Sequence, residues 1–511
     1  MSGHNLEMFM ASGNRIVVDP VEQYELSPFL YMQFMEPLGA TDGSVEAAWD
    51  HVQQAWRPDV LEVTKELAPG MMRWGGCFSS YYRWKEAVGP RNRRRPMINI
   101  LWGGVESNQI GSDEFLDFCR QVKTEPLLGV NFESDGRERW AHPRPGLIRT
   151  AGPAEAAAWV DFCNNASNPM RRKFRSRCPR RVKWWQIGNE TSYDPRGYDC
   201  ATTARRTVAF AKAMRKADPG IKLIGWGDSG WAREIMNGAG EHLDMLAFHH
   251  MFNPGKDDPK SPLRDSNYRL DPDRTWEHLM AASDIHDKKL RWMREQTAGL
   301  NVPLAMTECH MTLFGRNRGD VLSTWAAGVF NARMLNVNER HGDVLKIATV
   351  ADFCGTRWQV NAVMIPIPRS RGRAFLMPSG RVMGLYRAHQ GRFALRVAAP
   401  DGLDVTASRT GGKIFLHVVN TRRTRAVTTA LAVAEGSIAG GRVFEIAAPP
   451  EAEIIETCPD LLNVTQKPLP AGRGKARGAS SGVKTAVWTF PPASVSAVEL
   501  DMDKSSVSRG G

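Results

Sequence analysis

Residues 182–190 read Val-Lys-Trp-Trp-Gln-Ile-Gly-Asn-Glu, and this stretch decides the fold predicted for the chain. Its first six residues are mostly apolar or aromatic, which is typical of a buried β-strand, and the strand pattern stops at Gly188. An amide and a carboxylate directly after a buried strand favour a barrel of alternating strands and helices, because such barrels place their chemistry at the C-terminal ends of the strands. Taken alone, an Asn-Glu pair after an apolar run is more often a helix cap or a solvated loop.

A second stretch of the chain ends in the same way. Residues 302–308 read Val-Pro-Leu-Ala-Met-Thr-Glu, so a second glutamate follows a second apolar strand pattern. Glutamates at the ends of two separate strands can face each other across a barrel mouth, and cleavage of a glycosidic bond needs such a pair. We predict that Glu190 is the acid/base and Glu308 the nucleophile. Carboxyl groups about 5–5.5 Å apart would retain the configuration of the sugar, and a wider spacing would invert it.

Polar residues beside the two glutamates are expected to support them. Asn189 is predicted to bond the 2-hydroxyl of the sugar, where hydrogen bonds strengthen in the transition state. Arg73 ends another strand pattern and is predicted to keep Glu308 ionised by charge pairing. Three histidines, His249, His250 and His310, could bind either a metal ion or sugar hydroxyls. Their spacing matches no zinc pattern, so we predict no metal ligand and no cofactor.

The order of elements supports a barrel. Apolar strand patterns alternate with amphipathic helical patterns about eight times, beginning with a strand at 29–36 and ending with one at 358–365. This alternation predicts an α/β fold, a (β/α)8 TIM barrel. An open Rossmann-type sheet is the alternative, but no glycine-rich phosphate loop follows any of the strand patterns.

The pattern changes after about residue 375. Short strand patterns are then separated by Gly, Pro and Asn, which is typical of a β-sandwich, here a jelly-roll-like one. The predicted organisation is an N-terminal strand at 1–26 that joins the sandwich, a catalytic barrel at 27–375, the β-sandwich at 376–503 and a disordered tail at 504–511.

Composition limits the partners. The 511 residues are 42% hydrophobic and 24% charged, with a formal net charge of +12, which fits a folded protein with a basic surface. The charge could serve an anionic partner, but no nucleic-acid motif accompanies it, so a solvated arginine-rich surface is favoured and no nucleic-acid partner is predicted. The eight cysteines include no Cys-x-x-Cys pair, which indicates free thiols.

The expected location follows from two further patterns. Residues 1–7 lack a basic segment followed by an apolar one, so no signal peptide is predicted. No run of about 18 apolar residues occurs, so no membrane partner is expected. The prediction is a cytoplasmic protein.

Several motifs resemble those of glycoside hydrolase family 51, the retaining α-L-arabinofuranosidases, over nearly the whole chain. The opening strand with Glu36 looks like the family strand whose glutamate contacts the sugar, and the loop that contains Trp102 is the most specific match. The matching segments are 26–31, 34–39, 72–76, 102–108, 111–115, 187–190 and 307–308. The resemblance implies that the acid/base ends strand four, that the nucleophile ends strand seven, and that the C-terminal β-sandwich takes in the N-terminal strand. It also implies a carbohydrate substrate and a homo-oligomer.

The sugar-binding residues of the family are altered in this chain. Cys77 stands where the family has an asparagine that touches arabinose, and Met251 stands two residues after His249, where a tyrosine bonds the nucleophile. Cys309 and His310 replace the Trp-Asn pair that follows the nucleophile. The resemblance therefore implies a sugar site formed by Glu36, Arg73, Cys77, Trp102, Asn189, His249, Met251 and His310. Two other interpretations stay open: a carbohydrate-binding protein with altered catalysis, and a glycosidase for a different glycan, an acidic one included.

Overall fold

The computed structural model describes residues 14–39, 44–174, 176, 181–256, 258–264, 267–313, 320–434, 436–471 and 484–503. Within these residues, eight parallel strands form one sheet, the barrel sheet, in the order β2-β5-β8-β9-β10-β11-β12-β13. The strands are β2 (Gln33–Met35), β5 (Met71–Trp74), β8 (Glu125–Val130), β9 (Trp184–Ile187), β10 (Lys222–Trp226), β11 (Met245–Phe252), β12 (Leu304–Met311) and β13 (Leu345–Ile347).

The two edges of the barrel sheet are joined by backbone hydrogen bonds. The Met32 N–H donates to the Ala348 carbonyl at 2.9 Å, and the Ala348 N–H donates to the Phe29 carbonyl at 3.0 Å. Residue 348 follows β13, and residues 29–32 precede β2. These bonds bring the first and last strands of the barrel sheet together, and the predicted α/β barrel class is confirmed.

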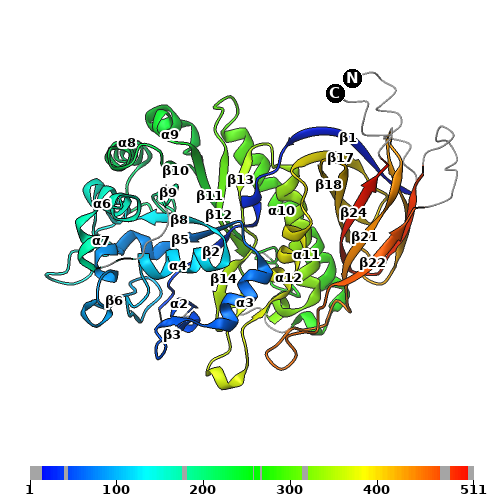
Figure 1. Cartoon of the computed structure of the whole chain (residues 1–511), viewed down its shortest axis with the longest axis horizontal. Helices are drawn as coiled ribbons and strands as arrows, with labels where there is room; N and C mark the ends of the chain where they lie inside the picture. Colours follow the sequence, from blue (N-terminus) through cyan, green and yellow to red (C-terminus); the bar gives the residue numbers. More distant parts are fainter. Residues whose placement is uncertain are drawn as a thin grey trace.

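Helices alternate with the strands of the barrel sheet and cover its outside (Figure 1). The helices are α2 (Ser44–Ala48), α3 (Pro58–Leu67), α4 (Ser112–Val122), α5 (Glu138–Ala141), α6 (Pro153–Asn164), α7 (Pro169–Phe174), α8 (Cys200–Ala217), α9 (Ala232–Ala239), α10 (Pro272–Gln296), α11 (Trp325–Arg340) and α12 (Pro378–Ala388). Local sequence fixes their starts. The Asp199 carboxylate accepts the Thr202 N–H at 2.7 Å at the start of α8, and Asp271 caps α10, whose first residue is proline.

The predicted eighth strand was wrong. Residues 358–365 do contain a strand, β15 (Asn361–Met364), but it pairs with β14 (Asp352–Gly355) and β16 (Phe375–Leu376) in a separate sheet. The eighth barrel strand is β13. It has only three residues, Leu345–Ile347, which is too short for a recognisable strand pattern. An apolar run indicates a buried strand but does not identify the strand with which it pairs.

The described part of the chain also forms a nine-stranded, mostly antiparallel sheet, the C-terminal sheet. Its order is β22-β21-β24-β19-β18-β17-β1-β20-β23, and its edge strands β22 and β23 contact each other, so the sheet curls around its own apolar core. The strands are β1 (Arg15–Glu25), β17 (Phe393–Ala398), β18 (Leu403–Thr410), β19 (Lys413–Asn420), β20 (Val427–Val433), β21 (Ile438–Ala447), β22 (Thr465–Pro470), β23 (Ala486–Phe490) and β24 (Ser494–Met502).

Strand β1 lies between β17 and β20, so the N-terminal strand belongs to the C-terminal sheet. Figure 1 shows this dark blue strand crossing to the late strands on the right. The exact boundaries at 26/27 and 375/376 stay a prediction, and the predicted tail at 504–511 lies outside the described residues. The small remaining sheets pair β3 (Trp49–Asp50) with β4 (Ala55–Trp56), and β6 (Met97–Ile98) with β7 (Val105–Glu106).

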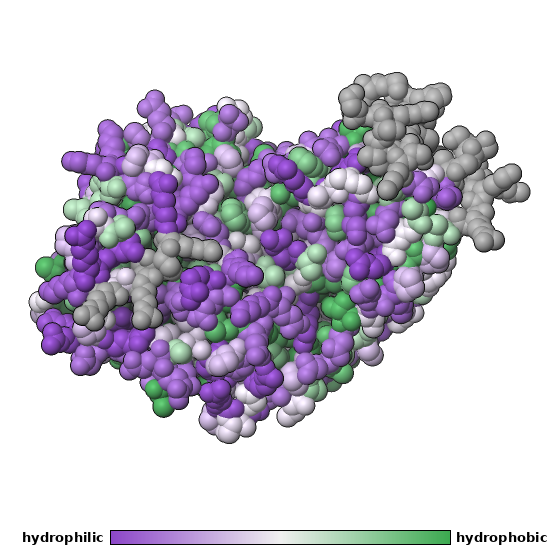
Figure 2. Space-filling model, viewed as in Figure 1, coloured by the Kyte–Doolittle hydropathy of each residue, from purple (hydrophilic) through white to green (hydrophobic). Residues whose placement is uncertain are grey.

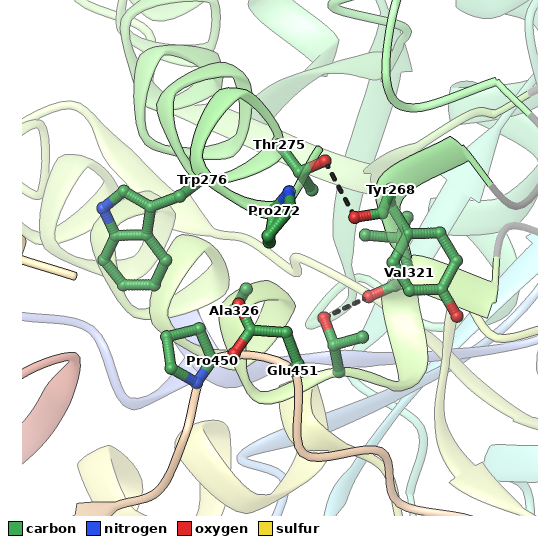
Figure 3. A pocket seen from close by; sticks show the side chains of 9 residues that line it. Tyr268, Pro272, Thr275, Trp276, Val321, Ala326, Pro450 and Glu451 are labelled. Atoms are coloured by element: carbon green, nitrogen blue, oxygen red, sulfur yellow. Dashed lines mark hydrogen bonds between the residues drawn. The ribbon is translucent and has the colours of Figure 1, made fainter. Parts of the chain in front are cut away.

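Helices α10, α11 and α12 lie between the barrel sheet and the C-terminal sheet (Figure 1). The Trp325 indole N–H donates to the Ala493 carbonyl at 2.6 Å, and the Trp276 indole N–H donates to the Thr421 carbonyl at 3.1 Å. Figure 3 shows a small pocket at this junction, where Pro450 and Glu451 lie against the starts of α10 and α11.

A buried carboxylate joins the two parts of the molecule at the same junction. Glu339 on α11 accepts hydrogen bonds from the Tyr31 hydroxyl at 2.5 Å, from Thr406 and from the His417 Nδ1 at 3.1 Å. Tyr31 precedes the barrel, and Thr406 and His417 belong to the C-terminal sheet. One side chain thus ties three distant segments together.

The surface is mainly polar. Figure 2 shows hydrophilic residues over most of one face, with apolar residues in small scattered groups. Among the described residues, no helix has both the length and the apolar character that crossing a membrane requires.

Candidate active site

The two predicted catalytic glutamates meet at one end of the barrel sheet. Glu190 follows β9, and Glu308 is the fifth of the eight residues of β12. The ring of His249, on β11, links them: its Nδ1 lies 3.0 Å from Glu190 Oε1 and 3.6 Å from Glu308 Oε2. One oxygen of each carboxyl group lies within 4.8 Å of the other. This upper limit on the distance between the two oxygens is compatible with carboxyl groups about 5–5.5 Å apart, the spacing that suits a retaining mechanism.

The backbone turns sharply to place Glu190. Gly188 has a φ of +82° and Glu190 has a φ of +53°, so two of three consecutive residues adopt left-handed conformations. Glycine tolerates this region, but for glutamate it is uncommon and costs energy. A Cβ on Gly188 would lie 2.8 Å from the Thr191 hydroxyl oxygen, which explains the glycine. Arg137 donates to the Glu190 carbonyl at 3.0 Å and holds the turn.

Arg73 fixes Glu308 and its surroundings. The guanidinium is fully buried, and it donates to Glu308 Oε1 at 2.7 Å, to Asn189 Oδ1 at 2.6 Å and to Gln186 Oε1 at 2.9 Å. A planar guanidinium with three fixed partners orients all of them. Arg73 therefore lies where the charge pairing predicted for it would act, and it also positions Asn189 beside the acid.

The two glutamates have different electrostatic surroundings. Burial raises the pKa of Glu190 above its ordinary value, with the Cys77 hydrogen bond opposing the shift. Burial also raises the pKa of Glu308, and here His249 and Arg73 oppose it. Only Glu308 has a direct ion pair with an arginine, so Glu308 is the better placed of the two to stay ionised while Glu190 holds a proton.

His249 is neutral near neutral pH, because burial lowers its pKa to about 4. Its Nδ1 faces two carboxyl groups, so this nitrogen carries the ring proton, and Nε2 accepts from the Thr307 hydroxyl at 3.0 Å. The ring therefore acts as a fixed donor between the two glutamates.

Cys77 contacts the predicted acid directly. Its thiol donates to Glu190 Oε2 at 3.3 Å and lies 3.9 Å from the Asn189 amide nitrogen. Burial raises the pKa of the thiol well above its ordinary value, with Glu190 adding to the shift, so the sulfur stays protonated and donates. The predicted sugar contact is thus also a neighbour of the acid/base.

Glu36 and Trp102 form one wall of the site. The Trp102 indole N–H donates to Glu36 Oε1 at 3.3 Å, and the Phe78 backbone N–H donates to the same oxygen at 3.1 Å. Burial, together with the nearby Glu308, raises the pKa of Glu36 well above its ordinary value. A protonated Glu36 could donate a hydrogen bond to a sugar hydroxyl.

His310 and Met251 lie opposite each other in the ladder between β12 and β11. Burial alone would lower the pKa of His310, but the Asp352 carboxylate, 2.9 Å from its Nδ1, raises it above the ordinary value. Met251 lies where the resemblance places a tyrosine, and a thioether cannot replace the hydroxyl donor of that tyrosine.

Sequence reasoning missed Asp228 and Tyr193. The Tyr193 hydroxyl donates to Asp228 Oδ2 at 2.7 Å, and the same oxygen lies 3.3 Å from the His249 backbone nitrogen. Asp228 follows β10 by two residues, and a carboxylate just after a predicted strand is the signal that could have found it. Tyr193 lies in an irregular loop and left no such signal.

Part of the chain is similar to known proteins. Residues 63–269 match the model of the alpha-L-arabinofuranosidase 1 domain. Alpha-L-arabinofuranosidase C from Emericella nidulans is 34% identical over 217 residues, which are 40% of this chain and 40% of the fungal protein. The central part of this chain is therefore similar to alpha-L-arabinofuranosidases. The match with the fungal enzyme therefore spans well under half of that enzyme's own length.

Other alpha-L-arabinofuranosidases match over more of the chain. An intracellular exo-alpha-(1->5)-L-arabinofuranosidase from Halalkalibacterium halodurans is 25% identical over 379 residues, 68% of this chain and 69% of that protein. The structure of alpha-L-arabinofuranosidase from Thermotoga maritima in complex with arabinose has a TM-score of 0.74 and 23% identity. The similarity covers 95% of this chain and 99% of that one, so the likeness of fold extends over both the barrel sheet and the C-terminal sheet.

Proposed function

We propose that the protein is a retaining α-L-arabinofuranosidase that acts by double displacement, with Glu190 as acid/base and Glu308 as nucleophile. The observation that carries the proposal is the carboxyl pair within 4.8 Å, bridged by His249. The match of residues 63–269 to the alpha-L-arabinofuranosidase 1 domain supports the choice of reaction, and the names of the fungal and bacterial relatives support arabinofuranosides as the substrate class.

In the first step, a carboxylate oxygen of Glu308 attacks the anomeric carbon of the sugar. The glycosidic C–O bond breaks, and Glu190 gives its proton to the departing oxygen, so the aglycone leaves as an alcohol. Arg73 lies on the other oxygen of Glu308 and supports the anion before attack. The product of this step is a sugar ester of Glu308.

In the second step, Glu190 is a carboxylate and acts as the base. It removes a proton from water, whose oxygen attacks the anomeric carbon while the ester bond to Glu308 breaks. Two inversions at the same carbon retain its configuration, and both glutamates return to their starting states. His249 donates between the two carboxyl groups throughout and is a positioning residue for both.

Two of the positions at which the sugar site departs from the pattern of the family bear on substrate choice. Cys77 offers a thiol that already donates to Glu190, and Met251 offers a thioether without a hydroxyl. Glu36, Trp102 and Asn189 keep the polar groups that the family pattern provides. We infer that an arabinofuranosyl unit is held mainly through these three residues, with weaker recognition beside Cys77.

The decisive experiment follows hydrolysis of 4-nitrophenyl α-L-arabinofuranoside and records the first-formed anomer by NMR. Wild type should release the retained anomer. Glu190→Ala should lower kcat/KM for arabinosides with poor leaving groups by about 10²–10⁴-fold, with a smaller loss for the nitrophenyl glycoside, because that leaving group needs little protonation. Glu277→Gln, an exposed glutamate on α10, is the control. Equal activity of Glu190→Ala and wild type, or an inverted product, would reject the proposal, and sugar binding without turnover would favour a carbohydrate-binding protein.

Replacing Cys77 by alanine is expected to move the basic limb of the pH profile of kcat/KM to higher pH. The thiol hydrogen bond lowers the pKa of Glu190, so its loss raises that pKa, and the acid then keeps its proton over a wider range. Cys77→Ser retains a hydrogen-bond donor to Glu190, so its basic limb should lie at nearly the same pH as in wild type. A limb that moves to lower pH in Cys77→Ala would contradict this role of the thiol.

A further inference from the structure

Three buried donor side chains converge on the side of β11 and β12 that faces α10. His250 lies on β11, Cys309 on β12 and His286 on α10. The two Nδ1 atoms lie 3.0 Å apart, and Cys309 Sγ lies 4.0 Å from His286 Nδ1. One ligand atom from each residue lies within 4.8 Å of the other two. All three side chains are buried.

A hydrogen bond from its Nε2 fixes the orientation of the His286 ring. Its Nε2 lies 2.8 Å from the Asn338 side-chain oxygen, which can only accept, so Nε2 carries the proton. The lone pair of His286 therefore sits on Nδ1 and points at His250 and Cys309. In metal sites, the ring nitrogen of a histidine ligand that does not bind the metal usually donates a hydrogen bond to a neighbouring group. This hydrogen bond sets the tautomer and the orientation of the ring.

The three ligand atoms and the distances between them suit Zn²⁺, a cation of borderline softness. Two imidazole nitrogens and one thiol sulfur are ligands that Zn²⁺ prefers. A tetrahedral zinc centre with bonds of about 2.0–2.3 Å separates its ligand atoms by roughly 3.3–3.7 Å. The observed separations of 3.0 and 4.0 Å need to change by only a few tenths of an ångström.

We propose that His250, His286 and Cys309 form a zinc-binding site that is separate from the catalytic glutamates. On binding, the Cys309 thiol loses its proton and binds as thiolate, and the proton on His250 Nδ1 moves to its Nε2, so one proton is released per ion. Three protein ligands leave the fourth position to water. Lys289 on α10 is paired with Asp228 at 2.6 Å, which offsets its repulsion of a bound cation. The dispersed positions 250, 286 and 309 form no compact motif, which is why the sequence alone predicted no metal.

The zinc site would stabilise the catalytic residues from the outer face of the barrel sheet. His250 follows His249, and Cys309 follows Glu308, so two of the ligands are adjacent in sequence to residues that face the sugar pocket. Successive residues of a strand point to opposite faces. A cation that joins β11 and β12 to α10 would therefore hold both strands in place without touching the substrate.

The test measures metal, not turnover, so it does not depend on the proposed activity. The full-length protein is dialysed against ZnCl₂ and then against buffer, and bound zinc is measured by mass spectrometry. We expect one retained Zn²⁺ per chain in wild type, loss of it in Cys309→Ser, and affinity about 10–100-fold lower in Asn338→Ala. Co²⁺ should give a thiolate charge-transfer band in wild type, and Cys309→Ser should lack it.

Two controls separate this site from other ligands. Glu190→Gln removes a ligand from the cluster of Glu190, His249 and Glu308, and it should retain the zinc. Cys458→Ser removes a half-buried thiol elsewhere and should also retain it. Zinc content that is equal in wild type and Cys309→Ser, or zinc lost only in Glu190→Gln, would overturn the proposal. If Cys309→Ser does not fold, the wild-type Co²⁺ spectrum decides: no thiolate band means no such site.

Discussion

Replacing Glu308 by glutamine is expected to lower kcat for an aryl arabinofuranoside by about 10⁴–10⁶-fold, because the attacking group is then uncharged and no sugar ester forms. Glutamine is nearly the same size as glutamate, so the packing against Arg73 stays almost unchanged. The loss of kcat then reflects the missing nucleophile and not a change in structure. Burst and steady-state kinetics with the nitrophenyl glycoside provide the measurement, and circular dichroism checks the fold.

Glu308→Gly with added azide offers a sharper form of the same test. A small anion in the space of the missing side chain attacks the anomeric carbon once, so the glycosyl azide has inverted configuration. In Glu190→Ala, azide would instead attack the sugar ester and give a retained product. Retained azide product from the Glu308 variant would show that the two roles have been exchanged.

Replacing Glu339 by alanine is expected to lower the free energy of unfolding by about 3–5 kcal/mol, the usual loss when one member of a buried charged pair is removed. Tyr31, Thr406 and His417 would each lose their acceptor inside the junction. Denaturant titration followed by fluorescence measures the change, with the exposed Glu295→Gln as control. A loss below about 1 kcal/mol would mean that the junction does not depend on this carboxylate.

The same residue predicts how stability depends on pH. Burial alone would raise the pKa of Glu339, but His417 and the hydrogen bonds lower it below the ordinary value. A lowered pKa in the folded state gives stability that is present above the ordinary pKa of glutamate and is lost as the pH falls through the folded-state pKa. The difference in stability between wild type and Glu339→Ala should therefore shrink in acid.

The sequence predicted those parts of the site that lie directly after strand patterns. Glu190 and Glu308 each end an apolar run, and the repeating geometry of a barrel brings such positions together. Two contacts depend on the conformation of irregular loops: that of Cys77 with Glu190 and that of Tyr193 with Asp228. The spacing of apolar residues along the sequence does not predict such loop conformations. The eighth strand was misplaced because β13 is too short to be recognised, whereas the more apolar β15 pairs elsewhere.

The position of β1 between β17 and β20 has a consequence for biosynthesis. The ribosome makes residues 15–25 early, but their neighbours at 393–398 and 427–433 emerge only after the whole barrel has been translated. Until then β1 has two unpaired edges, and such edges promote association with other chains. The nascent chain must therefore keep β1 unpaired until these later residues emerge, and the C-terminal sheet is completed by a segment that is translated before the barrel.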